Sequence, residues 1–234
     1  MSTWVSVARL HLVHWTSGLV GMWANMAFVF ALEWVIIAGV RAHTTHPPTH
    51  GYFVGGAGVL FVYFLIFGLV STGRGLPFAL ALGVTRRAYY TGAAVFAAGL
   101  AVANGALFAL FAVVERTTGG WGVGMHFFRV PWILDGPWYL TGMTSFVLLA
   151  LLFLYGMWFG IVYRRWGAAA VIAFAVAQVT VLLSAVLAVT WFHAWPAVGR
   201  FFTGLTVEGL VGVLAGVALL LLVGGYGTIR RATV

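Results

Sequence analysis

Histidine is the residue type in this sequence best suited to metal or haem chemistry, and three histidines lie close together. His43, His46 and His50 stand in the stretch RAHTTHPPTH, and neutral imidazole is a good ligand for zinc or copper. Pro47 and Pro48 interrupt the helix that would align these side chains, and no cysteine or neighbouring carboxylate completes a site. The pattern favours a solvated loop over a metal centre.

The distribution of all the histidines also disfavours a b-type haem. Bis-histidine ligation needs imidazoles that face each other from different helices at similar depth. Each histidine here precedes the first long apolar run or falls in a loop or at a helix end: His11, His14, His43, His46, His50, His126 and His193. A b-type cytochrome remains the alternative in which the chain is an enzyme, and the sequence supports it less than the non-enzymatic functions considered below.

Other catalytic signatures are missing from the chain. There is no GxxxxGK[ST] phosphate loop and no lysine anywhere, and neither HExxH nor GxSxG occurs. We therefore expect a protein that is not itself an enzyme and that binds no cofactor, so that any ATP and magnesium would belong to a partner.

Composition places the chain in the membrane. It is 63% hydrophobic and 7% charged, with a mean hydropathy of +1.06 and no cysteine, values typical of integral membrane proteins. The formal charge of +8 comes from arginines at segment ends and in loops. Such arginines fix topology and contact anionic lipid headgroups, so we expect no nucleic-acid partner.

Apolar runs predict an all-α membrane protein in which residues 1–234 form a single transmembrane domain. Residues 1–15 read as an amphipathic helix lying along the interface. About 20 apolar residues cross a bilayer, and six runs of that kind are present, near residues 18–40, 51–70, 92–114, 139–163, 167–190 and 209–229.

Three polar residues inside these spans are candidates for a pathway or for contacts between helices. Asn25 and Glu33 fall in the first span, and Gln178 falls in the fifth. A carboxylate at mid-membrane costs about 2.5–3.5 kcal/mol unless it faces protein or water, so Glu33 is expected to face inward. Its alternative is a carboxylate near the outer interface that is protonated or paired with an arginine.

Arginine asymmetry predicts the orientation. Six spans put one set of arginines, with no acid, on one side: Arg9, Arg74, Arg86, Arg87, Arg164, Arg165, Arg230 and Arg231. The other side carries Arg41, Arg116, Arg129 and Arg200 with Glu115, Asp135 and Glu208. The positive-inside rule then predicts a multi-pass protein of the cell membrane with both termini in the cytoplasm. The aromatic-rich segment 115–138 would lie on or dip into the outer interface, or act as a lid.

The connection between the second and third spans is the most distinctive segment. In STGRGLPFALALGVTRRAYYT, proline stands near the first position of a short helix over residues 76–88. Leu76, Leu80 and Val84 share one face of that helix. Arg86 and Arg87 fall at its C-terminal end, where positive charge complements the helix dipole. The helix could dock in a groove on a soluble protein, or it could simply turn the chain between two spans.

This stretch, GRGLPFALALGVTRRAYYTG, together with the plan of an N-terminal amphipathic helix and six spans, resembles the membrane subunit of type-2 ATP-binding-cassette exporters. The resemblance covers essentially the whole chain. It implies that the cytoplasmic helix is a coupling helix that docks on a separate ATPase through Pro77, Phe78, Leu80, Gly83, Arg86 and Arg87. One departure is that the longest outer segment here lies between spans three and four.

The resemblance implies an export permease. Two membrane subunits, identical or homologous, would form a pathway that two copies of the ATPase drive, and the cargo would be hydrophobic or amphipathic, such as a drug, a peptide or a lipid. The alternatives are an ATP-independent secondary transporter and a structural membrane subunit.

Overall fold

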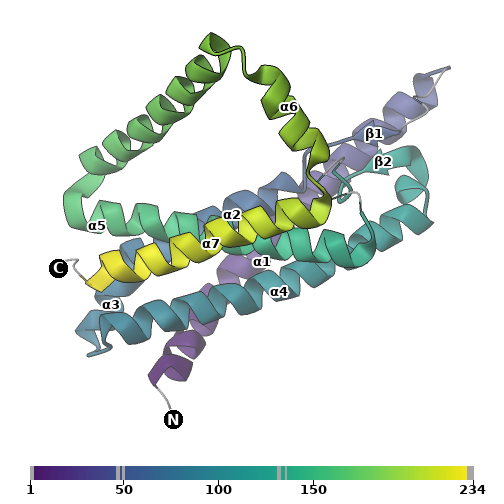
Figure 1. Cartoon of the computed structure of the whole chain (residues 1–234). Coiled ribbons are helices and arrows are strands. Elements are labelled where there is room, and N and C mark those ends of the chain that lie inside the picture. Colours follow the sequence, from purple (N-terminus) through teal and green to yellow (C-terminus); the bar gives the residue numbers. More distant parts are fainter. Residues whose placement is uncertain (1–2, 46–47, 49–50, 131–132, 135, 231–234) are drawn as a thin grey trace.

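The chain folds almost entirely into helices, as a computed structural model shows (Figure 1). The structure describes residues 3–45, 48, 51–130, 133–134 and 136–230. Its elements in chain order are α1 (Thr3–His43), β1 (Tyr52–Phe53), α2 (Gly58–Val70), the π-helical segment η1 (Ser71–Gly75), α3 (Leu76–Ala81), α4 (Arg86–Thr117), the turn η2 (Gly120–Gly124), β2 (Met125–His126), α5 (Trp138–Trp191), α6 (Trp195–Gly204) and α7 (Val207–Arg230).

Five helical stretches within the described ranges are long and apolar enough to cross a membrane: Gly18–His43, Gly58–Ala81, Arg86–Thr117, Trp138–Trp191 and Val207–Thr228. The stretch Trp138–Trp191, which is α5, has 54 residues, far more than one crossing needs. It is broken at Gly167, whose φ of 78° and ψ of −173° are accessible essentially only to glycine. We call residues 138–166 the packed arm of α5 and residues 168–191 its projecting arm.

The segment predicted as a fifth span near residues 167–190 is thus helical, but it leaves the bundle. Figure 1 shows the projecting arm diverging from the other helices and α6 leading the chain back to the start of α7. Near the bend, the ring of Phe174 lies 5.3 Å from that of Phe159, and Tyr155 donates a hydrogen bond to Gln178. Beyond these contacts most of the arm is exposed.

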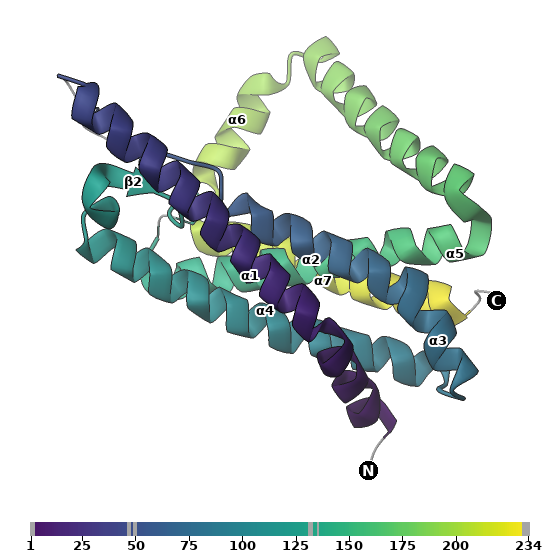
Figure 2. The ribbon, with the colours of Figure 1, turned by 180° about the vertical axis from the view of Figure 1, so that it is seen from behind.

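Residues 1–15 were expected to form a separate interfacial helix, and here the structure differs from the prediction. From Thr3 onward they belong to α1, which continues without a break to His43. A glycine such as Gly18 costs a helix only about 1 kcal/mol relative to alanine, and a helix that continues satisfies its own backbone groups, as a bilayer requires. Figure 2 shows α1 lying across α2 and α4.

The tightest contact of the bundle joins α2 to the packed arm. A Cβ added at Gly156 would overlap the carbonyl oxygen of Leu65, and one added at Gly68 would overlap that of Phe153. Just beyond these contacts, the hydroxyl of Thr72 in η1 donates to the carbonyl oxygen of Met157 at 2.9 Å. Small residues that let two backbones approach are a common way to associate helices in membranes.

The bundle has two distinct ends. At one end lie the N-terminus of α1, the α3–α4 turn, the bend of α5 and the C-terminus of α7 (Figure 1). This arginine-rich end includes Arg74, Arg86, Arg87, Arg164 and Arg165. At the other end, which we call the cap end, residues 118–130 fold back over the helices, and β2 pairs in parallel with β1. The grouping of arginines that the sequence predicts is therefore present in the fold.

Candidate functional site

The predicted coupling helix over residues 76–88 is interrupted. α3 ends at Ala81, a turn follows, and α4 begins at Arg86. Gly83 has a φ of 79°, its amide donates to the carbonyl of Leu80 at 2.9 Å, and the amide of Val84 donates to that of Ala79 at 3.0 Å. These two bonds form a Schellman motif, which ends a helix at a left-handed glycine. The sequence reasoning missed this stop.

Because the helix stops at Gly83, Arg86 and Arg87 do not lie where the sequence predicted. They are the first two residues of α4, after the cap residue Thr85, whose hydroxyl accepts from the amide of Ala88 at 3.2 Å. The expectation that they complement a helix C-terminus is wrong, because they stand at the positive end of the dipole. That placement costs about 0.3–1 kcal/mol for each charge, so helix stability does not account for it.

We call residues 74–87 the tip, and it combines exposed apolar and basic side chains. Phe78 is 58% exposed and Leu82, which the sequence reasoning did not single out, is 60% exposed. Arg74, Gly83 and Arg87 are exposed as well. Among the other predicted docking residues, Pro77 and Arg86 are half-buried, and Leu80 is half-buried against the core.

The tip is firmly attached to the bundle. Tyr89, one turn into α4, is fully buried. Its hydroxyl donates to the carbonyl oxygen of Ser71 in η1 at 2.5 Å. That carbonyl lies in a π-helical segment, where the regular helical hydrogen-bond pattern is altered and extra partners are useful. Thr72, next in η1, also donates to the packed arm, so buried contacts hold the segment beneath the tip against the bundle.

The three polar candidates of the spans serve separate contacts. Asn25 donates to the hydroxyl of Tyr63 on α2 at 3.2 Å, and Gln178 accepts from Tyr155 across the bend of α5. Glu33 is half-buried at the cap end, beside Gly56. Its Oε2 is buried, with no hydrogen-bond partner among the described residues. The structure does not bring these residues together into one pathway.

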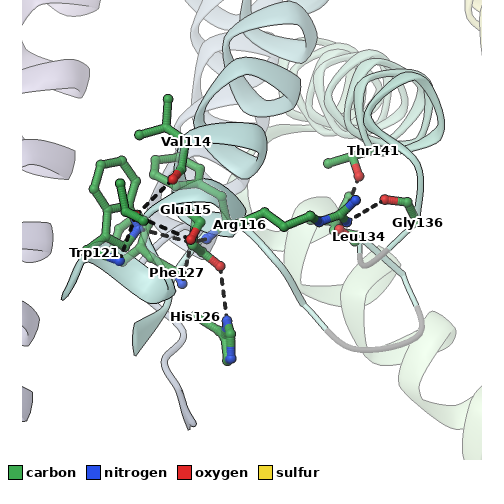
Figure 3. A network of polar contacts seen from close by, with 11 residues as sticks. Val114, Glu115, Arg116, Trp121, His126, Phe127, Leu134, Gly136 and Thr141 are labelled. Atoms are coloured by element: carbon green, nitrogen blue, oxygen red, sulfur yellow. Dashed lines mark hydrogen bonds and ion pairs between the residues drawn. The ribbon is translucent and has the colours of Figure 1, made fainter. Parts of the chain in front are cut away.

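Glu115 is a buried carboxylate that the sequence reasoning counted only as a charge. It lies at the end of α4 with its side chain fully buried (Figure 3). Its Oε2 accepts from the amides of Phe127 and Phe128 at 2.9 and 2.8 Å and from the indole of Trp121 at 3.1 Å. Its Oε1 lies 3.3 Å from Nδ1 of His126. A charge without such partners would be very costly to bury.

The turn that brings these donors to Glu115 is built from left-handed residues. Gly119, Gly120, Gly122 and Gly124 all have positive φ, as does Trp121 at 58°. For a residue other than glycine that backbone costs about 1–3 kcal/mol and persists only where surrounding contacts over-determine it. Trp121 is fixed by its bond to Glu115 and by its amide, which donates to the hydroxyl of Thr118 at 3.0 Å.

The described part of the segment predicted over residues 115–138 therefore packs against the helices at the cap end: residues 118–130 fold back over them. Phe127 and Phe128 are buried, with ring centroids 5.1 Å from Phe30 and 5.0 Å from Phe111 respectively. The signal in the sequence was an acid in the last turn of an apolar helix, followed by a glycine-rich run with a tryptophan and a histidine. That signal could not show which donors would converge.

The histidines whose side chains the structure describes lie apart from one another. His43 bonds to the carbonyl oxygen of Gly39 in its own helix at 2.8 Å, and His193 follows the projecting arm. His46 and His50 lie outside the described residues. Within the described part of the chain no group of three histidine or acidic side chains is placed to hold a metal ion.

Comparison of the chain with known protein families, with curated proteins and with solved structures finds no match.

Proposed function

We propose that the chain is the membrane subunit of an ATP-driven exporter and that a separate ATPase docks on the tip. The resemblance of residues 73–92 to coupling segments suggests the activity. The observation that carries it is the placement of Arg86 and Arg87 at a helix N-terminus beside the exposed Phe78 and Leu82. Charges held where their own helix disfavours them, next to exposed apolar side chains, fit an acidic, partly apolar groove on a partner.

The physical route of coupling follows from the contacts beneath the tip. ATP binding and hydrolysis occur on the partner, since this chain carries no phosphate loop. Movement of the tip is transmitted by Tyr89 to η1 and by Thr72 to the packed arm. In this proposal the tip faces the cytoplasm, a second membrane subunit completes the pathway, and the cargo is hydrophobic or amphipathic.

Capture of the partner tests the proposal. The full chain is purified from crosslinked membranes of its native host, and co-purifying proteins are identified by mass spectrometry. We expect an ATPase with a phosphate-loop motif. The double variant Phe78→Ala with Arg87→Glu should retain less than about a tenth of it, because losing an aromatic anchor and a charge at a docking site costs 2 kcal/mol or more.

A matched control is available on α6. Phe201 is 60% exposed and Arg200 is exposed as well, so Phe201→Ala with Arg200→Glu makes the same chemical change away from the tip and should keep the ATPase. Equal recovery from both double variants would contradict docking at the tip. If no ATPase co-purifies and transport by reconstituted protein follows an ion gradient, the chain is the ATP-independent transporter instead.

A further inference from the structure

A polar hollow opens at the cap end, on the opposite side of the molecule from the tip. Its volume is about 370 Å³. Arginines from three parts of the chain line it, namely Arg41 near the end of α1, Arg116 near the end of α4, and Arg129 just beyond β2. His126 and Tyr52, from the paired strands, line it as well. The other hollows described on the surface have almost wholly apolar walls.

The charged side chains among the described lining residues of the hollow are all arginines. No acidic residue occurs among its described lining residues. The nearby carboxylate of Glu115 is enclosed behind His126 by its own donors. In Figure 3 the side chain of Arg116 extends away from Glu115, and it donates to the carbonyl of Gly136 at 2.8 Å. Three guanidinium groups around one small volume favour an anion with several oxygens.

Contacts between different parts of the chain hold the walls of the hollow together. Arg41 donates to the carbonyl oxygen of Gly122 at 3.2 Å, tying α1 to the turn η2. A Cβ added at Gly51 would lie 2.6 Å from the carbonyl oxygen of Gly124 and 2.7 Å from Nε2 of His126. Only glycine therefore lets the strand β1 approach this closely. A rigid site of this kind loses little conformational entropy on binding.

Exposed aromatic side chains near the hollow indicate that the anion is the phosphate of a lipid headgroup. At the same end Phe53, Trp138 and Tyr139 are 52%, 63% and 50% exposed. Exposed aromatic side chains at the end of a membrane bundle mark the level of the lipid headgroups. At that level the phosphate of a lipid lies beside the hollow, and its acyl chains can extend along the apolar outside of the bundle.

We propose that this hollow binds the phosphodiester headgroup of an anionic phospholipid through Arg41, Arg116 and Arg129. Tyr52 forms part of the same wall. The site is independent of the ATPase proposed above, because it lies at the other end of the bundle and shares no residue with the tip.

Binding of short-chain lipids to the purified full chain tests this inference. Dioctanoyl phosphatidylglycerol, dioctanoyl phosphatidylcholine and inorganic phosphate are titrated separately into protein in a neutral detergent, and tryptophan fluorescence reports binding. Both lipids carry a phosphodiester, but the choline cation of phosphatidylcholine is repelled by the three arginines. Phosphatidylglycerol should therefore bind at least about tenfold more tightly than phosphatidylcholine. Equal affinity for the two lipids would overturn the proposal, and so would tight binding of inorganic phosphate that phosphatidylglycerol cannot displace.

Variants locate the site. Arg41→Gln with Arg129→Gln should weaken phosphatidylglycerol binding about tenfold or more. The matched variant Arg200→Gln, an exposed arginine of α6, should change it by less than about twofold. Thermal unfolding without lipid checks that each variant folds, and Arg129→Gln alone, with a loss of about threefold or more, replaces the double variant where that one does not fold. Wild-type affinity in the folded arginine variants would refute the assignment.

Discussion

The two arms of α5 are both apolar and are separated only by Arg164, Arg165 and the break at Gly167, yet they have opposite surroundings. The buried residues of α5 all lie between Leu140 and Val162, in the packed arm. In the projecting arm Leu182 and Leu187 are 67% and 68% exposed. The packed arm buries small and polar residues such as Thr144, Gly156 and Gly160 together with larger apolar ones, whereas the bulky aliphatic residues of the projecting arm are exposed. In a bilayer, small side chains mark contacts between helices, because lipid is as apolar as leucine.

The largest effect is expected where the packed arm crosses α2. Gly156→Leu would drive a side chain into the carbonyl oxygen of Leu65 and should destabilise the protein by about 3 kcal/mol or more. Unfolding in a detergent series, followed by circular dichroism, measures the change. Gly216→Leu on α7, where an added Cβ meets nothing within 4 Å, is the matched control and should remain folded. A well-folded Gly156→Leu protein would show that the crossing is looser than described.

A smaller effect is expected at the cap end. Glu115→Gln keeps the shape of the side chain but removes its charge and replaces one of two acceptor oxygens. Because Oε1 and Oε2 together serve four groups, at least one buried partner loses its acceptor, which costs about 1–3 kcal/mol. Thermal unfolding measures this, and Glu208→Gln at the start of α7 is the control. Equal melting temperatures would mean that the packing of residues 118–130 does not depend on Glu115.

The smallest effect is expected in the projecting arm. Leu187→Ala should change the free energy of unfolding by less than about 0.5 kcal/mol. The exposed side chain of Leu187 is surrounded by apolar lipid whether or not the arm is folded against the rest of the protein. Unfolding in lipid nanodiscs is the measurement, with Leu149→Ala, fully buried in the packed arm, as the contrasting variant at about 2–5 kcal/mol. Similar losses for the two leucines would remove the distinction between the arms.

Much of the helical architecture could be predicted from the sequence, because apolar length and arginine placement act locally. The apolar runs became helices, except that residues 51–57 of the predicted second span form β1 and a turn before α2 begins, and the arginines of residues 74–87 and 164–165 gathered at one end. The stop at Gly83 was missed because Leu80, Val84 and Arg86 fit a helical period on either side of it. Glycine tolerates both helical and left-handed conformations, and only the closing hydrogen bonds decide between them.

Burial was harder to predict than helicity. Hydropathy cannot separate a helix packed on protein from one that faces lipid, so the divergence of residues 168–191 had no clear signal. The buried contacts of Glu115 could not be predicted for another reason. Its hydrogen-bond partners are brought to it by a turn in which five residues have positive φ, namely Gly119, Gly120, Trp121, Gly122 and Gly124. Trp121 in particular has a left-handed backbone conformation that residues other than glycine rarely adopt. A prediction from backbone preferences would therefore not have given this turn.

The break at Gly167 gives the molecule a long lever with a one-residue pivot. The projecting arm has about 24 residues and, at 1.5 Å for each, extends about 36 Å from that glycine. A rotation of about 10° at the pivot would therefore displace its far end by about 6 Å, roughly the rise of one helical turn. Arg164 and Arg165 lie just before the pivot, at the same end as the tip. Small adjustments there would be magnified at the far end of the projecting arm, where the chain turns into α6 (Figure 1).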